Sequence, residues 1–159
     1  MTTKTRFYLA VLVPIVLLDR ATKALAVTHL PMAVPRPVFG NALRFTLLFN
    51  RDAAMNLTLG PWSRWGFAVI AIVGVLYLLR LLQLTPPKAW LRAAALGAVS
   101  AGAIGNLIDR LLSDRGVVDF IDVGVGVHRF WVFNVADVGV SVGAVLLAYV
   151  LAREGKASG

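Results

Sequence analysis

The chain has 159 residues, of which 58% are hydrophobic and only 15% are charged. Soluble domains are roughly 45–50% apolar and about 25% charged, and the apolar excess here lies in long runs, so we expect one integral membrane domain spanning residues 1–159. The absence of cysteine excludes disulfides, zinc–thiolate sites and cysteine nucleophiles. The net charge of +8 does not indicate nucleic-acid binding, because no basic segment carries interleaved aromatic residues.

Four segments have the character of membrane-spanning helices, which need about 20 mainly apolar residues. They are residues 7–27, 65–82, 91–112 and 134–152. The first follows two basic residues in the manner of a signal peptide. However, the polar stretch 19–23 stands where a small-residue cleavage site would be expected, so we predict an uncleaved helix.

The loops after the first and third helices are rich in β-forming residues. Residues 38–60 contain the strand-like run 43–49 and a candidate second strand at 57–59, and residues 116–133 contain further short apolar runs. Two predicted helices separate the loops, so both lie on one side of the membrane and can form a small sheet over the helix ends. The predicted fold is therefore a four-helix membrane bundle with a small β-sheet, an α+β membrane protein.

The basic residues at and beyond the helix ends do not predict the orientation of the chain. Cytoplasmic loops normally carry the excess of lysine and arginine. Here each side of the predicted membrane carries seven such residues, not counting those within residues 19–23. The positive-inside rule therefore gives no answer.

Carboxylates near a membrane are costly and are candidates for a functional site. Five of the eight acidic residues lie between positions 109 and 137. Asp137 is predicted one turn into the last helix, on the same face as Asn134, although an N-cap with a first-turn acid would explain both residues equally well. Asp119 interrupts an apolar, strand-like run of the predicted sheet, and the last helix begins beneath that sheet. Two such carboxylates can converge, share one proton and activate water against a carbonyl group without a metal or cofactor.

Two further polar pairs are predicted on the same side. Asn106 and Arg110 are four residues apart and share a helix face, as do Asp19 and Lys23. The alternatives are an arginine that extends to the membrane surface and a simple ion pair within one helix. The clustering of these groups beside the β-rich loops favours a site.

Four motifs in the chain together resemble those of the lipoprotein signal peptidases, the signal peptidase II family. Residues 19–23 match D-x-x-x-K, 105–110 match G-N-x-x-D-R, 116–120 match G-x-V-x-D-F, and 133–137 match F-N-x-A-D. They occur in the family's order among four predicted helices, and the resemblance covers nearly the whole chain. Each motif alone is weak, whereas four in register are specific.

The resemblance implies an aspartic peptidase that cleaves bacterial prolipoproteins just before a diacylglyceryl-modified cysteine. The catalytic pair would be Asp119 and Asp137. The residues implied to support or line the site are Asp19, Lys23, Asn50, Gly105, Asn106, Arg110 and Asn134. It further implies a bundle in the bacterial inner membrane with an extracytoplasmic β-cradle beside the active site and both termini cytoplasmic. No metal or cofactor is expected, membrane lipid and the lipidated substrate are the expected partners, and a monomer is expected.

One element departs from the family pattern. Where the family has N-x-G-A-A-F, this chain has Asp52 in place of the glycine and Met55 in place of the phenylalanine. Glycine adopts positive φ at little cost and aspartate less readily, so we expect a different loop conformation and a third acid near the pair. An inactive homologue therefore stays an alternative. A small transporter with a proton relay is the other, although its acids should lie at mid-depth rather than near helix ends.

Overall fold

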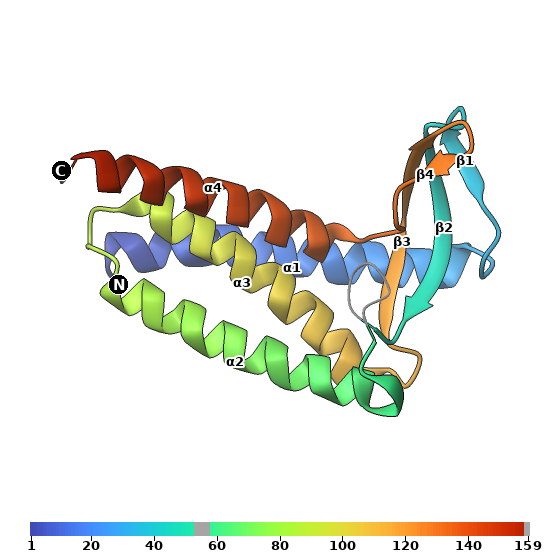
Figure 1. Ribbon diagram of the computed structural model, residues 1–159, viewed down its shortest axis with the longest axis horizontal. Helices are drawn as coiled ribbons and strands as arrows, with labels where there is room; N and C mark the ends of the chain where they lie inside the picture. Colours follow the sequence, from blue (N-terminus) through green and yellow to red (C-terminus); the bar gives the residue numbers. More distant parts are fainter. Residues whose placement is uncertain (53–57, 158–159) are drawn as a thin grey trace.

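The computed structural model describes residues 1–52 and 58–157, and this part of the chain contains four long helices and a small sheet (Figure 1). The helices are α1 (Thr3–His29), α2 (Ser63–Leu84), α3 (Trp90–Leu112) and α4 (Val135–Ala157). The strands are β1 (Arg36–Phe39), β2 (Leu43–Asn50), β3 (Val117–Val125) and β4 (His128–Arg129), and a short 3-10 helix, η2 (Gly60–Trp62), precedes α2.

Among the described residues, three helical segments are long and apolar enough to cross a membrane: Gly60–Leu84, Trp90–Leu112 and Val135–Lys156. The first predicted span, residues 7–27, lies within α1, which is 27 residues long. Its C-terminal half carries Asp19, Arg20 and Lys23, which lower its mean hydropathy. That α1 crosses the membrane as a fourth span therefore stays a prediction.

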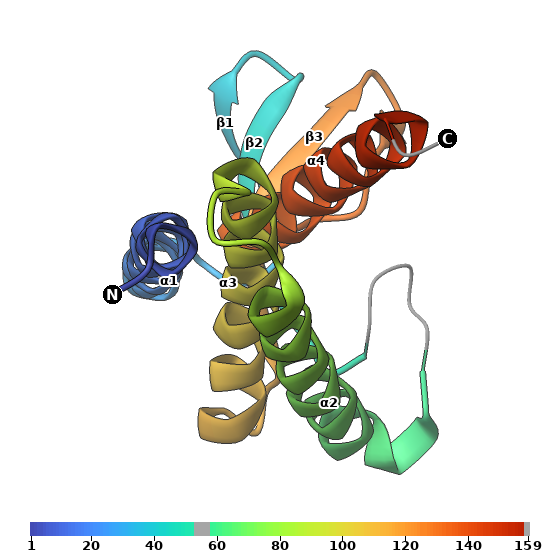
Figure 2. The same ribbon diagram turned by 90° about the vertical axis from the view of Figure 1, so that its left-hand side faces the viewer.

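Helix α3 lies at the centre of the arrangement and packs against α1, α2 and α4 (Figure 2). Small residues make this possible, because they let helix backbones approach closely. A Cβ atom on Gly102 would clash with the carbonyl oxygen of Ala136 in α4, and one on Gly143 would come within 2.8 Å of the backbone nitrogen of Val99. The α3–α4 contact is thus made backbone to backbone.

The strands form one antiparallel sheet in the order β1-β2-β3-β4, so the predicted small sheet is confirmed. The strands run crosswise to the helices at one end of the molecule (Figure 1). Leu48 in β2 pairs with Asp119 in β3, and Asn50 pairs with Val117. A buried cluster of Ala26, Leu47, Val118 and Phe120 fastens the sheet to the end of α1.

The candidate strand at residues 57–59 is wrong where the structure describes it. Thr58 and Leu59 lie outside any strand, because the Ser63 hydroxyl accepts a hydrogen bond from the Leu59 N–H (2.7 Å) and holds the turn into η2. Leu57 lies outside the described residues. The additional strand is β1, where Pro37 is tolerated because β1 is an exposed edge strand.

The close α3–α4 contact predicts that Gly102→Ala destabilises the protein. The added methyl group must push α4 away, and overpacking of this kind costs about 1–3 kcal/mol. Gly74→Ala in α2 is the matched control, since a Cβ atom there meets nothing within 4 Å and alanine favours a helix over glycine by about 1 kcal/mol. Thermal denaturation in detergent micelles should show a lower midpoint for Gly102→Ala alone. Equal midpoints would mean that α3 and α4 can accommodate the added methyl group and contradict the close contact.

Candidate active site

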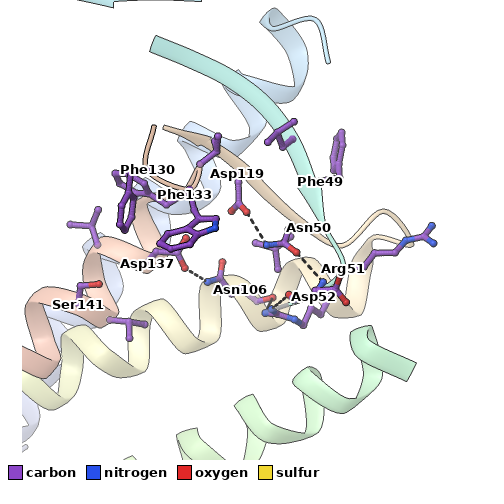
Figure 3. A pocket seen from close by; sticks show the side chains of 17 residues that line it. Phe49, Asn50, Arg51, Asp52, Asn106, Asp119, Phe130, Phe133, Asp137 and Ser141 are labelled. Carbon is purple, nitrogen blue, oxygen red and sulfur yellow. Dashed lines mark hydrogen bonds between the residues drawn. The ribbon is translucent and has the colours of Figure 1, made fainter. Parts of the chain in front are cut away.

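Asp119 and Asp137 line the same cavity, which has a volume of about 910 Å³ (Figure 3). Asp119 is buried and comes from β3, whereas Asp137 comes from the first turn of α4 and is half-buried. Asn134 connects them: its side-chain amide donates to Oδ1 of Asp119 (2.7 Å), and its backbone N–H donates to Oδ2 of Asp137 (3.0 Å). One fully buried residue thus holds both carboxylates of the predicted pair.

The start of α4 fixes the orientation of Asp137. The side-chain oxygen of Asn134 accepts a hydrogen bond from the Asp137 N–H (3.0 Å), while the Asp137 carboxylate accepts one from the Asn134 N–H. This reciprocal arrangement is a capping box. The N-cap with a first-turn acid, which the sequence left open as an alternative to a functional site, is therefore present. The other carboxylate oxygen of Asp137, Oδ1, is left to accept a hydrogen bond from the Asn106 side chain (2.8 Å).

The amide of Asn106 is oriented from behind by Lys23. Its oxygen accepts hydrogen bonds from the Lys23 ammonium (2.9 Å) and from the Asn134 side chain (3.1 Å). An ammonium group can only donate, so it requires the amide oxygen on its own side and turns the amide NH2 toward Asp137. Lys23 thus acts on Asp137 through Asn106.

Lys23 is buried between two carboxylates. Its Nζ lies 2.9 Å from Oδ2 of Asp19 and 2.8 Å from Oδ2 of Asp109. The second oxygen of Asp19 accepts the Ala136 N–H in α4 (2.9 Å), and Asp109 accepts the Val118 N–H in β3 (3.2 Å). The pairing of Asp19 with Lys23 is therefore more than an ion pair within one helix, because the cluster ties α1 and α3 to the two elements that carry Asp119 and Asp137.

Gly105 is required by this cluster, since a Cβ atom there would lie 2.7 Å from Oδ2 of Asp19. Asp109 also pairs with Arg20. From the sequence, Asp109 was recognisable only as part of a motif, and its structural role was not predicted. It lies four residues after Gly105, so helical spacing would have placed both residues on the side of α3 that faces α1.

The remaining predicted residues lie at the sheet side of the cavity. Asn50, at the end of β2, donates to Oδ2 of Asp119 (3.4 Å) and accepts the Asp52 N–H (2.9 Å). Arg110 is buried and donates to the carbonyl oxygens of Asp52 (3.1 Å) and Asn106 (3.3 Å). It therefore points into the cavity rather than to the membrane surface.

Asp52 also lines this cavity, so a third acid does lie near the pair. The left-handed conformation that favours glycine is not used there, because Ala33 is the one non-glycine residue with positive φ in the described part of the chain. Met55, the other departure, lies outside the described residues. Sequence analysis did not anticipate Phe130, Trp131 and Ser141 in the lining, although Ser141 lies four residues after Asp137 on the same helix face.

Burial raises the pKa of Asp119 from its ordinary value of 3.8 to about 7, and the negative charge of Asp137 adds to the increase. Hydrogen bonds from Asn134 and Asn50 favour the ionised form and oppose the increase in the pKa. Asp119 can therefore supply a proton near neutral pH. The described residues hold no group of three histidine or acidic side chains that could bind a metal ion.

The family model for signal peptidase (SPase) II matches residues 11–153. The chain belongs to the signal peptidase II family. The lipoprotein signal peptidase of Hydrogenovibrio crunogenus is 43% identical over 137 residues, covering 84% of this chain and 77% of the relative. That of Teredinibacter turnerae is 39% identical over 138 residues, covering 85% and 80%.

A solved structure supports the same conclusion. It is a bacterial membrane enzyme determined by the in meso method at 2.3 Å resolution, which superposes with a TM-score of 0.80 at 27% identity and covers 93% of this chain and 88% of the other. Together with the three apolar helices, the likeness identifies a multi-pass membrane protein. The chain is thus a membrane peptidase of the signal peptidase II family.

The buried cluster predicts that Lys23→Met lowers stability strongly. The change leaves the buried Asp19 carboxylate without its cation and Asp109 with Arg20 alone, and breaking a buried pair in this way costs about 3–5 kcal/mol. The comparison variant is Glu154→Gln, whose carboxylate pairs with Arg92 at 3.2 Å and is largely exposed, so that its loss should cost less than about 1 kcal/mol. Denaturation in detergent micelles measures both. Similar losses in the two variants would show that Lys23 does not hold the site together.

Proposed function

We propose that this peptidase removes the signal peptide from diacylglyceryl-modified prolipoproteins, cleaving just before the lipidated cysteine. The names and coverage of its relatives support the substrate class. The single observation that carries the chemistry is Asn134, which hydrogen-bonds to both Asp119 and Asp137 within one cavity. That cavity lies where the helices meet the sheet, beside the start of an apolar span, so it suits a substrate held in the bilayer.

The two carboxylates divide the work of peptide hydrolysis. Asp119 enters in its protonated form and donates its proton to the oxygen of the scissile carbonyl. Asp137, ionised and held by Asn106 and Asn134, takes a proton from the attacking water as the new C–O bond forms. The tetrahedral intermediate then collapses, the C–N bond breaks, and the amine leaves with the proton carried by Asp137 while Asp119 recovers its own. No metal or cofactor takes part.

We further propose how the chain is arranged in the membrane. Helix α1 crosses as the fourth span and completes a four-helix bundle, and residues 1–159 act as one domain. The apolar side chains Val13, Leu17 and Leu25 of α1 are exposed, whereas Asp19 and Lys23 are buried against the other helices. This pattern suits a helix that is surrounded by lipid on one side. The sheet then covers the extracytoplasmic face of the bacterial inner membrane, both termini are cytoplasmic, and the enzyme works as a monomer.

The proposed pair predicts that Asp119→Asn and Asp137→Asn each lower kcat by several orders of magnitude, because either change removes one proton transfer. The measurement is cleavage of a diacylglyceryl-modified prolipoprotein in lipid vesicles, with the fold of each variant checked by thermal denaturation. Asp114→Asn is the control, since this acid is exposed and pairs with Arg64 outside the cavity lining.

Retained activity in either dyad variant would show that the pair is misassigned. If the unmodified chain does not cleave, it is an inactive homologue or acts on another substrate. Asp52→Gly, which restores the family residue, separates these two cases because cleavage should reappear only in the first.

The pKa of Asp119 predicts the pH dependence of the reaction. The protonated form is the acid, so kcat/KM should fall as the pH rises through about 7. Asn50 stabilises the ionised form, so Asn50→Ala should raise the pKa of Asp119 and move this fall in kcat/KM to higher pH. Gln83→Ala, at the end of α2 that lies away from the sheet, should leave the pH profile of kcat/KM unchanged. A profile that rises through neutral pH would contradict the role given to Asp119.

A further inference from the structure

Two adjacent turns at one end of the sheet display apolar side chains to the outside. Val38 and Phe39 lie at the end of β1, and Val125 and Val127 lie around the β3–β4 turn. The exposed fraction is 77% for Phe39 and 90% for Val127, and the other two are also exposed. These four residues are called the apolar tip below. Exposed apolar patches of this kind mark interaction surfaces more often than chance.

Hydrogen bonds and ion pairs join the two turns that carry the apolar tip. Asn41 in the first turn donates to the carbonyl oxygen of Gly126 in the second (3.3 Å), and the Gly124 N–H donates to the carbonyl oxygen of Ala42 (3.0 Å). Beneath the turns, the buried Asp122 carboxylate accepts hydrogen bonds from Arg44 (2.7 Å) and Arg129 (2.6 Å).

The ion pairs of Asp122 with Arg44 and Arg129 persist in mild acid. Burial alone would raise the pKa of Asp122, but the hydrogen bonds from Arg129, Arg44 and Thr46 outweigh it and hold the pKa below its usual value. The carboxylate therefore stays ionised and keeps both arginines in place at neutral pH. The apolar side chains are held in a fixed geometry rather than carried on a loose loop.

No part of the chain that the structure describes covers the apolar tip. The sheet packs on the ends of α1 and α3, and the hairpin turns project sideways beyond α3 and α4 in both views (Figures 1 and 2). The strands run crosswise to the helices, so the turns lie beyond the start of α4 and near the level of the C-terminal end of α1 (Figure 1). At this level the side chains face the headgroup layer just outside the span formed by α4.

We propose that the apolar tip inserts into the interfacial layer of the bilayer on the α4 side of the molecule, where headgroups meet acyl chains. The spanning helices expose apolar side chains, such as Val142 and Val145 in α4, and the apolar tip adds further exposed apolar side chains beyond the start of α4. Withdrawing exposed apolar side chains from water is favourable, and interfacial segments bury apolar side chains to this shallow depth.

The segment after β4 extends the same surface to the cavity. Phe130 and Trp131 are half-exposed and also line the cavity that holds Asp119 and Asp137. Aromatic rings, tryptophan above all, favour the membrane–water interface. Insertion of the apolar tip therefore places the cavity mouth at the bilayer surface, where a lipid-attached chain can enter without leaving the membrane.

Depth measurement with a single label tests the insertion directly, because the natural chain has no cysteine. A Val127→Cys variant and an Arg36→Cys control, which lies on exposed β1 away from the turns, each carry the same fluorophore in phosphatidylethanolamine–phosphatidylglycerol vesicles. We expect lipid-borne nitroxide to quench the label at position 127 several-fold more strongly than the label at 36, and aqueous iodide to show the reverse order. Equal quenching at the two positions, or stronger iodide quenching at 127, would overturn the proposal.

A second comparison tests whether apolarity drives the insertion. Adding Phe39→Ser and Val125→Ser to the Val127→Cys chain should move the label toward iodide and away from the nitroxide. Unchanged quenching, in a variant whose thermal midpoint in micelles is unchanged, would contradict the proposal. Neither readout requires cleavage, so the insertion and the proposed peptidase activity can fail separately.

Discussion

The buried ammonium of Lys23 is the interaction on which the rest of the site depends. Taking a cation and two carboxylates out of water is expensive and is compensated only if each charge finds partners. Asp19 and Asp109 find them in the ammonium and in the backbone N–H groups of Ala136 and Val118. The start of α4 and the start of β3 are thereby fixed to α1 and α3, and these are the two places from which Asp137 and Asp119 project.

Two neutral amides stand between this charge cluster and the cavity. Asn106 faces Lys23 with its oxygen and Asp137 with its nitrogen, while Asn134 reaches both carboxylates. Amides can separate charges in this way because each one carries a donor and an acceptor on the same rigid plane. The ion cluster can therefore orient the carboxylates without placing its own cation in direct contact with them, and the pKa of Asp119 stays raised by burial and by Asp137.

Much of this could be predicted from the sequence, because long apolar runs locate helices and because Asp119 and Asp137 stand in segments that had to meet beneath one sheet. The strand β1 was missed, since Pro37 argues against a strand unless it lies at an edge, and edges depend on tertiary pairing. The charge count gave no orientation. Several arginines on the sheet side form ion pairs, such as Arg44 and Arg129 with Asp122, and a count of residues does not distinguish paired from free cations.

The residues that hold the two carboxylates in place also limit how this protein can evolve. Gly105 cannot gain a side chain without displacing Asp19, and Asn134 cannot change without releasing a helix cap and two carboxylates at once. The side chains of Phe130, Trp131 and Ser141, which line the cavity, make no hydrogen bonds to other described residues. Variation in substrate preference, and escape from an inhibitor that occupies the cavity, should therefore arise at Phe130, Trp131 and Ser141. A compound that binds against Asn106, Asp119 and Asp137 would meet residues with little freedom to mutate.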